Sequence, residues 1–161
     1  MENENTLHEK FMRIAIELAE KNVLESIGGP FGAVVVKDEE LIASSPNMVL
    51  TTNDPTAHAE VVAIRNACRS LGNFQLDDCD VYASCEPCPM CLGAIYWARA
   101  RRVIYANTKE DAAAIAFDDQ FIYDEIDKND DQRRIQFIHQ PHPDALAVFE
   151  KWRAMENKVA Y

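Results

Sequence analysis

Two short strings place metal-binding side chains at the expected starts of helices: His58-Ala59-Glu60 and Pro87-Cys88-Pro89-Met90-Cys91. Cys88 and Cys91 share one helical face, because residues three apart on a helix are neighbours. The amino end of a helix carries partial positive charge, which favours the thiolate form that zinc binds. Two thiolates and the neutral imidazole of His58 suit zinc and leave one tetrahedral position open. The strings therefore predict a catalytic zinc site with one ion per subunit.

Glu60 follows His58 by two residues, so its carboxylate is expected beside the metal without ligating it. Zinc lowers the pKa of a bound water to about 7, which makes hydroxide available at neutral pH. A carboxylate beside that water can take its proton, pass it to a ring nitrogen and later assist the departure of an amine. These residues predict hydrolytic deamination with Glu60 as the proton shuttle.

Two alternative interpretations of the cysteines stay open. Three of the five cysteines lie within seven residues, which indicates metal binding rather than disulfides. A closed structural zinc site would add Cys85 as a fourth ligand, but Cys85 precedes Glu86-Pro87 at the expected end of a strand and need not share the helical face of Cys88. A thioredoxin-like redox pair would leave His58 and Glu60 without a role.

Hydrophobic periodicity predicts the elements that must position these residues. Apolar residues at three- and four-residue spacings predict an amphipathic helix over about 7–23, with Thr6 as its cap. The alternation of strands and helices in the second half of the chain predicts a layered α/β fold with parallel pairing there. The other expected elements are strands at 33–36, 41–43, 80–83, 102–106 and 135–138, and helices at 57–71, 88–99, 112–117, 120–126 and 143–157.

Length and charge limit the function classes. The 161 residues, 48% hydrophobic and 27% charged, fit a single domain spanning 1–161. The formal net charge of −11 disfavours nucleic acid as a partner, because nucleic-acid affinity depends on Lys and Arg neutralising phosphates. No apolar run approaches the roughly 20 residues that span a bilayer, and the acidic, polar start is unlike a signal peptide. We therefore expect a cytoplasmic protein without membrane contact.

Several strings together carry a resemblance to a known family. His-x-Glu followed by Pro-Cys-x-x-Cys is the established pattern of zinc nucleobase deaminases. With its other strings, the chain resembles bacterial guanine deaminases of the cytidine deaminase-like superfamily. The strings that carry the resemblance are GGPFGA at 28–33, NDPTAHAE at 53–60, SCEPCPMC at 84–91, CLGAIYWAR at 91–99 and FDD at 117–119.

The resemblance implies a fold and an assembly. It implies a three-layer α/β/α cytidine deaminase-like fold with a five-stranded mixed sheet, and a zinc ion held by His58, Cys88 and Cys91 with Glu60 as the proton shuttle. It also implies a homodimer in which the C-terminal segments can be exchanged. On that analogy Tyr161, the last residue, covers the site of the partner subunit.

The resemblance also places four side chains around a purine. The carboxylate of Asp119 suits the N1–H and amino donors of guanine, and the amide of Asn47 can meet the ring acceptors. Phe31 and Trp97 offer flat apolar surfaces for the base. Backbone N–H groups near Ala59 can help to orient the ring. The same residues also fit ordinary core, loop or surface positions.

The implied reaction is the hydrolysis of guanine to xanthine and ammonia. In it, hydroxide adds at C2 while Glu60 protonates N3. Within the same superfamily, deamination of guanosine, of tRNA adenosine, and of cytosine or cytidine are alternatives, although the net charge argues against RNA. A different class of function is an inactive, zinc-stabilised binding module. The presence of Glu60 argues against that module, because a scaffold has no need for an acid beside an open ligand position.

Overall fold

The computed structural model describes residues 4–161, which form two compact units. The first unit ends at Asp119 and contains the sheet; the second spans Gln120–Tyr161. Among the described helices, none is long and apolar enough to span a bilayer.

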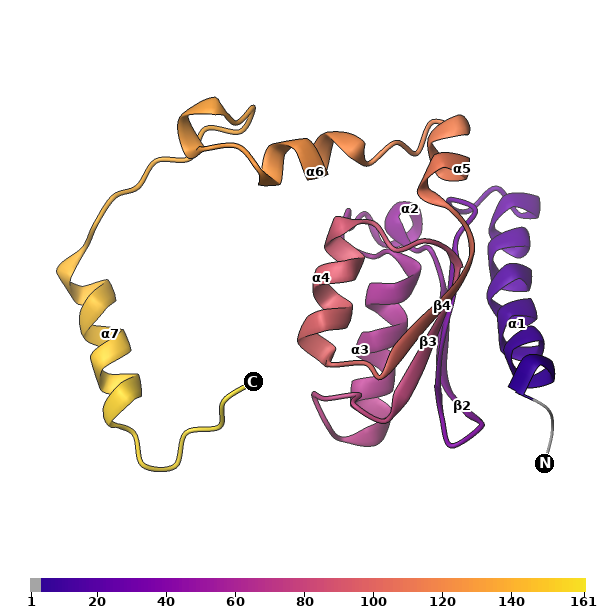
Figure 1. Cartoon of the computed structure of the whole chain (residues 1–161), viewed down its shortest axis with the longest axis horizontal. Helices are drawn as coiled ribbons and strands as arrows, with labels where there is room; N and C mark the ends of the chain where they lie inside the picture. The colour runs from indigo at the N-terminus through magenta and orange to yellow at the C-terminus, as the bar shows by residue number, and fades with distance from the viewer. Residues whose placement is uncertain (1–3) are drawn as a thin grey trace. The chain divides into compact units, whose positions relative to one another are not determined.

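The first unit is built on a mixed sheet (Figure 1). Its strands are β1 (Gly32–Lys37), β2 (Glu40–Pro46), β3 (Cys79–Cys85) and β4 (Arg102–Asn107). They are ordered β2-β1-β3-β4, with β1 antiparallel to both of its neighbours and β3 parallel to β4. The α/β class and the parallel pairing in the second half are therefore confirmed.

The predicted number of five strands is wrong for the described residues, whose sheet has four. Residues 135–138, expected as a strand, have no regular secondary structure. Their apolar side chains match the strand pattern, but a strand also needs a neighbour to accept its backbone hydrogen bonds. Within its own unit this segment is accompanied by helices and irregular backbone, so the pattern alone does not make a strand.

The β1–β2 connection is the hairpin that the sequence predicts. Asp38 and Glu39 both have positive φ, 49° and 64°. A two-residue turn with two positive φ values matches the right-handed twist of the flanking strands. Strand β2 runs back along β1, so that the first residue of β1, Gly32, pairs with the last residue of β2, Pro46. Asn47 follows directly after this pair.

Helices cover both faces of this sheet, as Figure 1 shows. Helix α1 (Glu4–Leu24) covers one face, and α3 (Ala59–Leu71) and α4 (Pro89–Ala98) cover the other. Two shorter helices, α2 (Val49–Thr52) and α5 (Lys109–Ala114), complete the first unit. Strand β1 alternates its side chains between the faces: Val34 packs with the α1 cluster, and Val35 with the cluster of α3 and α4. The three-layer arrangement is thus present in the first unit. Helix α1 begins at Glu4, so Thr6 lies inside the helix and is not its cap.

Helix α1 lies directly on β1 at Gly32. A Cβ atom at this position would lie 2.1 Å from the carbonyl oxygen of Ala15 and 2.9 Å from Cβ of Leu18. Because no side chain fits between the two backbones, glycine sets the distance between α1 and the sheet.

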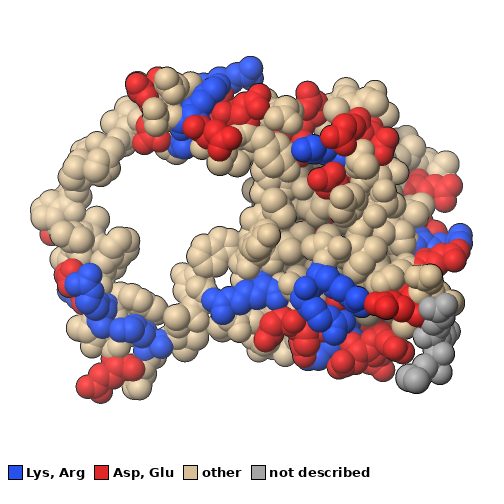
Figure 2. Space-filling view, viewed as in Figure 1, with Lys and Arg blue, Asp and Glu red and all other residues tan. Residues whose placement is uncertain are grey.

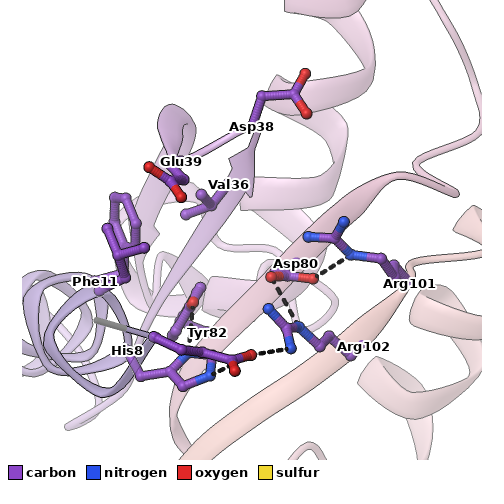
Figure 3. A pocket seen from close by; sticks show the side chains of 11 residues that line it. His8, Phe11, Val36, Asp38, Glu39, Asp80, Tyr82, Arg101 and Arg102 are labelled. Carbon is purple, nitrogen blue, oxygen red and sulfur yellow. Dashed lines mark hydrogen bonds and ion pairs between the residues drawn. The ribbon is translucent and has the colours of Figure 1, made fainter. Parts of the chain in front are cut away.

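An ion-pair network links α1 to the end of the sheet at which β3 and β4 begin (Figure 3). The buried carboxylate of Asp80 accepts hydrogen bonds from Arg101 Nε at 2.9 Å and Arg102 Nε at 3.0 Å. Arg102 also donates through Nη1 to Glu4 on α1, at 2.8 Å. These residues line a hollow of about 340 Å³ at the amino ends of β3 and β4, the end opposite to the cysteine string.

The second unit contains α6 (Gln120–Ile126), a short 3₁₀ helix η1 (Asp130–Gln132) and α7 (Pro143–Ala154). The predicted helix over 120–126 is confirmed, and the closing helix ends three residues earlier than expected. Glu125 holds the turn after α6, because its carboxylate pairs with Lys128 Nζ at 2.6 Å and accepts the backbone N–H of Arg134 at 2.7 Å.

Candidate metal centre

The starts of α3 and α4 bring the two sequence strings together. His58 is the residue immediately before α3, and Cys88 is the residue immediately before α4. Cys91 lies in the first turn of α4, whose first residue is Pro89. Both helices pack on the same face of the sheet, and β3 delivers the chain to α4 through Cys85. Their amino ends therefore meet at one end of the sheet.

The three predicted ligand atoms lie close together. Nδ1 of His58 is 3.5 Å from Sγ of Cys88 and 3.4 Å from Sγ of Cys91, and all three atoms lie within 4.8 Å of one another. Ligands in a tetrahedral zinc site, at about 2.0–2.3 Å from the metal, are separated by roughly 3.5 Å. One imidazole and two thiols are donors that zinc prefers. The geometry and the chemistry of these side chains both fit a zinc ion.

Among the described residues, the cluster consists of His58, Cys88 and Cys91 and does not include Cys85. It is buried at the end of β3, and its thiol donates to the carbonyl oxygen of Thr108 at 3.5 Å. Burial raises its pKa to about 11, which keeps it in the thiol form. The structure therefore favours the open three-residue site over the closed four-residue alternative.

The pKa values of the two cysteines in the cluster are shifted in opposite directions. The hydrogen bond from Cys91, with a further contribution from His58, lowers the pKa of Cys88 to about 4. The pKa of Cys91 is raised because its thiol donates to Cys88 and is buried. The hydrogen bond with Cys88 also raises the pKa of His58. A thiolate beside an imidazole is an arrangement ready for a divalent cation.

Glu60 occupies the first turn of α3, one residue after the fully buried Ala59. Its side chain is buried, and this desolvation raises the pKa of its carboxyl group. A carboxyl group whose pKa is raised toward neutrality is better suited to exchange protons near neutral pH. The negative charge of Cys88 raises this pKa further.

Phe31 and Asn47 lie on segments joined to the start of α3. The backbone N–H of Asn47 donates to the carbonyl oxygen of Phe31 at 2.9 Å, and that of Met48 donates to Ala57 at 2.9 Å. Ala57 directly precedes His58. The side chain of Asn47 is buried, and its Oδ1 accepts the N–H of Val49 at 3.2 Å. Because Oδ1 of Asn47 already accepts this hydrogen bond, we expect its amide nitrogen to be the group that donates to a ligand.

Phe117 is a residue that the sequence analysis did not single out for the site. Its ring meets that of Phe31 edge to face, with the centroids 4.9 Å apart. Two residues later, Asp119 is partly buried, and this burial, together with the charge of Cys88, raises the pKa of its carboxyl group. The string FDD marked this segment, but no pattern in the sequence shows that it meets Phe31.

Two predicted substrate-binding residues have no contact with the cluster within the first unit. Trp97 lies near the carboxyl end of α4, about 9 Å along the helix from Cys91, and is 68% exposed. Tyr161 belongs to the second unit. A role in substrate binding stays a prediction for both.

Comparison with known proteins gives consistent matches. Residues 5–107 match the family model described as the cytidine and deoxycytidylate deaminase zinc-binding region. The chain is 56% identical over 154 residues to the guanine deaminase of Bacillus subtilis, covering 96% of this chain and 99% of that protein. The crystal structure of a Bacillus subtilis guanine deaminase superposes with a TM-score of 0.92 at 56% identity, covering 96% of this chain and 98% of that chain. A tRNA-specific adenosine deaminase from Haemophilus influenzae is 40% identical over 109 residues, covering 66% of this chain and 62% of that protein.

Proposed function

Because the chain belongs to the cytidine and deoxycytidylate deaminase family, in its guanine deaminase branch, we propose that it converts guanine and water to xanthine and ammonia. The protein is a zinc-dependent hydrolytic deaminase. The observation that carries the proposal is the His58/Cys88/Cys91 cluster beside the buried Glu60, in a chain that matches a guanine deaminase over nearly its whole length.

The chemistry divides between the metal and the chain. A zinc ion held by His58, Cys88 and Cys91 supplies Lewis acidity, which makes water acidic enough to react at neutral pH. Glu60 takes a proton from the attacking water and delivers it to N3 of guanine as the water oxygen bonds to C2. Glu60 then moves the proton of the new C2 hydroxyl to the amino group, so that the C2–N bond breaks, the C2 carbonyl of xanthine forms and ammonia departs. The burial of Glu60 keeps this proton transfer away from bulk solvent.

Two polar side chains provide the recognition of the base. The carboxylate of Asp119 accepts from N1–H and from the amino group of guanine, and the amide nitrogen of Asn47 donates to the ring acceptors. Oδ1 of Asn47 is held by Val49, so its amide nitrogen has a defined direction. The backbone of Ala59, at the amino end of α3, offers further orienting contacts.

Aromatic side chains provide the apolar surface. Phe31, held edge to face by Phe117, can stack against one face of the purine. The resemblance also implies that Trp97 contacts the base, although it lies about 9 Å along α4 from Cys91 and is exposed. A purine buried between an aromatic ring and polar edge contacts is the usual form of nucleobase recognition in such enzymes.

The charge distribution favours a small-molecule substrate over tRNA. The formal net charge is −11, and on the face seen in Figure 2 the Lys and Arg side chains are interspersed with Asp and Glu. Arg101 and Arg102 both form ion pairs with the buried Asp80, and Arg102 also pairs with Glu4, so two carboxylates offset the two guanidinium charges. RNA binding needs basic side chains that are available to phosphates. We therefore propose a free purine base as the substrate and no nucleic acid as a partner.

We further propose that the working unit is a cytoplasmic homodimer with exchanged C-terminal segments. Strand β4 is the last strand of the described sheet, so its outer edge presents backbone groups that another strand can pair with. Residues 135–138 carry an apolar pattern typical of a strand but lie in irregular backbone. Pairing of this segment with β4 of a second copy would supply the fifth strand and bring Tyr161 to the site of that copy.

Ammonia release from the zinc-loaded protein tests the substrate. Guanine, guanosine, adenine, cytosine and cytidine are compared at equal concentrations, and we expect guanine to have the highest kcat/KM. Turnover of cytosine or cytidine without turnover of guanine would refute the guanine assignment while leaving the family unchanged. Zinc-loaded protein without turnover of any base would favour a binding module.

A further inference from the structure

Asn22, near the end of α1, is a buried polar residue with an unusual pair of contacts. It is 1% exposed, and its amide nitrogen donates to two backbone carbonyls: Asn47 at 2.7 Å and Gly29 at 3.1 Å. The other buried positions of α1 are the apolar residues Phe11, Ala15 and Ala19. Burying an amide costs free energy unless its hydrogen bonds are made, so the presence of Asn22 needs a reason beyond packing.

The two carbonyls belong to the segments that carry the proposed base-binding residues. Gly29 is two residues before Phe31, whose N–H donates back to the Gly29 carbonyl at 2.8 Å. Asn47 donates its own N–H to the Phe31 carbonyl at 2.9 Å. One side chain on α1 therefore joins both segments, at the point where they already bond to each other.

Gly28 packs against the hydrogen bond between Asn22 and the Asn47 carbonyl. A Cβ atom at this residue would lie 2.6 Å from Nδ2 of Asn22 and 2.7 Å from the carbonyl oxygen of Asn47. Both distances are too short for a real side chain atom, so a larger residue at this position must displace Asn22, Asn47 or its own backbone. The segment that contains Gly28 is therefore packed closely against Asn22 and the backbone of Asn47.

We propose that Asn22 is a positioning residue that sets the separation of Phe31 and Asn47 and thereby the affinity for the purine base. This inference rests on the proposed function, because it takes Phe31 and Asn47 as the residues that contact the base. Asn22 does not act on the reaction itself: the metal-binding cluster and Glu60 lie at the starts of α3 and α4, outside its hydrogen bonds.

Two substitutions disturb the contact from opposite sides. Asn22→Leu keeps the branched shape of the side chain but removes both donated hydrogen bonds. Gly28→Ala keeps Asn22 but places a methyl group against both partners of its contact with Asn47. For each variant we expect KM for guanine to rise about tenfold with kcat within about twofold, because a contact made equally in the ground and transition states is weakened. Zinc content should stay unchanged.

Phe11→Leu is the matched control. Phe11 is also buried on α1, but it packs against Tyr82, with the rings 5.4 Å apart, and has no contact with the two loop segments among the described interactions. This substitution weakens the packing of α1 and should lower the thermal unfolding temperature. KM for guanine should not change. The comparison separates loss of positioning from loss of stability.

Hydrogen exchange provides a readout that does not depend on turnover. The N–H groups of Phe31 and Asn47 should exchange faster in Asn22→Leu than in the wild type, and at the wild-type rate in Phe11→Leu. If the wild type does not convert guanine, the proposed function fails, and these exchange rates alone decide whether Asn22 holds the segments. Unchanged exchange, or an unchanged KM in both Asn22→Leu and Gly28→Ala with an active wild type, would overturn the inference.

Discussion

Nδ1 of His58 lies 3.4 Å from Sγ of Cys91, although 33 residues separate them along the chain. The contact joins the amino ends of α3 and α4, so both helices direct their positive ends toward the same point. Thiolate and imidazole ligands of one zinc ion require such convergence, and it is the basis of the predictions that follow.

Removal of one cluster ligand should remove the metal. We expect Cys88→Ser and Cys91→Ser each to reduce zinc from about one ion per chain to less than about a tenth, because a hydroxyl is a much weaker zinc ligand than a thiolate. Elemental analysis of the purified proteins measures this. Cys85→Ser is the control and should retain its zinc, since the Cys85 thiol bonds to the Thr108 carbonyl. Zinc loss in that variant would support the closed site.

Glu60→Gln should separate metal binding from proton transfer. The amide keeps the size of the side chain but cannot carry a proton between water and base, so we expect kcat to fall by about 10²–10⁴ with zinc retained. Ammonia release with guanine measures the rate. Glu39→Gln, at the exposed tip of the β1–β2 hairpin, removes an equal charge and should keep wild-type turnover. An active Glu60→Gln protein would refute the proton-shuttle assignment.

Asp119→Asn tests recognition of the base. A carboxylate that accepts from a ring N–H contributes about 1.5–3 kcal/mol, so its replacement should lower kcat/KM for guanine by about 10- to 100-fold. Asp118→Asn is the matched control, because the neighbouring side chain is exposed while Asp119 is partly buried. Equal effects of the two substitutions would indicate that the loss of charge, and not a specific contact, changes the rate.

The close approach of α1 and β1 at Gly32 predicts a large effect on stability. A Cβ atom at Gly32 would overlap the Ala15 carbonyl oxygen, so we expect Gly32→Ala to lower the free energy of unfolding by at least about 1–3 kcal/mol. Gly93→Ala, on the exposed side of α4, has nothing within 4 Å of its added Cβ. It should raise helix stability by about 0.5–1 kcal/mol. Urea unfolding measures the free energy of unfolding of both variants. Similar values for the two would contradict the close approach of α1 to β1 at Gly32.

The pairing of Glu4 with Arg102 predicts a dependence of stability on pH. The hydrogen bond from Arg102 lowers the pKa of Glu4 below its ordinary value of 4.5. The ion pair therefore stabilises the fold above pH 4.5, and its contribution is lost as the pH falls through the lowered pKa. Urea unfolding between pH 7 and acid pH should show a smaller decrease in Glu4→Gln than in the wild type. An identical decrease in both would show that Glu4 does not contribute.

The sequence alone determined the chemistry of the site. The ligand types, the spacing of Cys88 and Cys91 and the position of Glu60 after His58 are local properties, and helix geometry converts such spacings into shared faces. The alternation of strands and helices likewise predicted the α/β class, and the polar turn between residues 37 and 40 predicted the hairpin.

The tertiary structure decided what depends on contacts between distant segments. In the folded chain Phe117 contacts Phe31, and Asn22 donates hydrogen bonds to two backbone carbonyls. Trp97 lies on an exposed surface. It also left residues 135–138 without a strand partner in their own unit. The sequence pattern around a residue indicates whether that segment favours a helix or a strand and whether the residue is buried. Its neighbours across the fold are set by packing and by backbone hydrogen bonds between elements, which no local pattern contains.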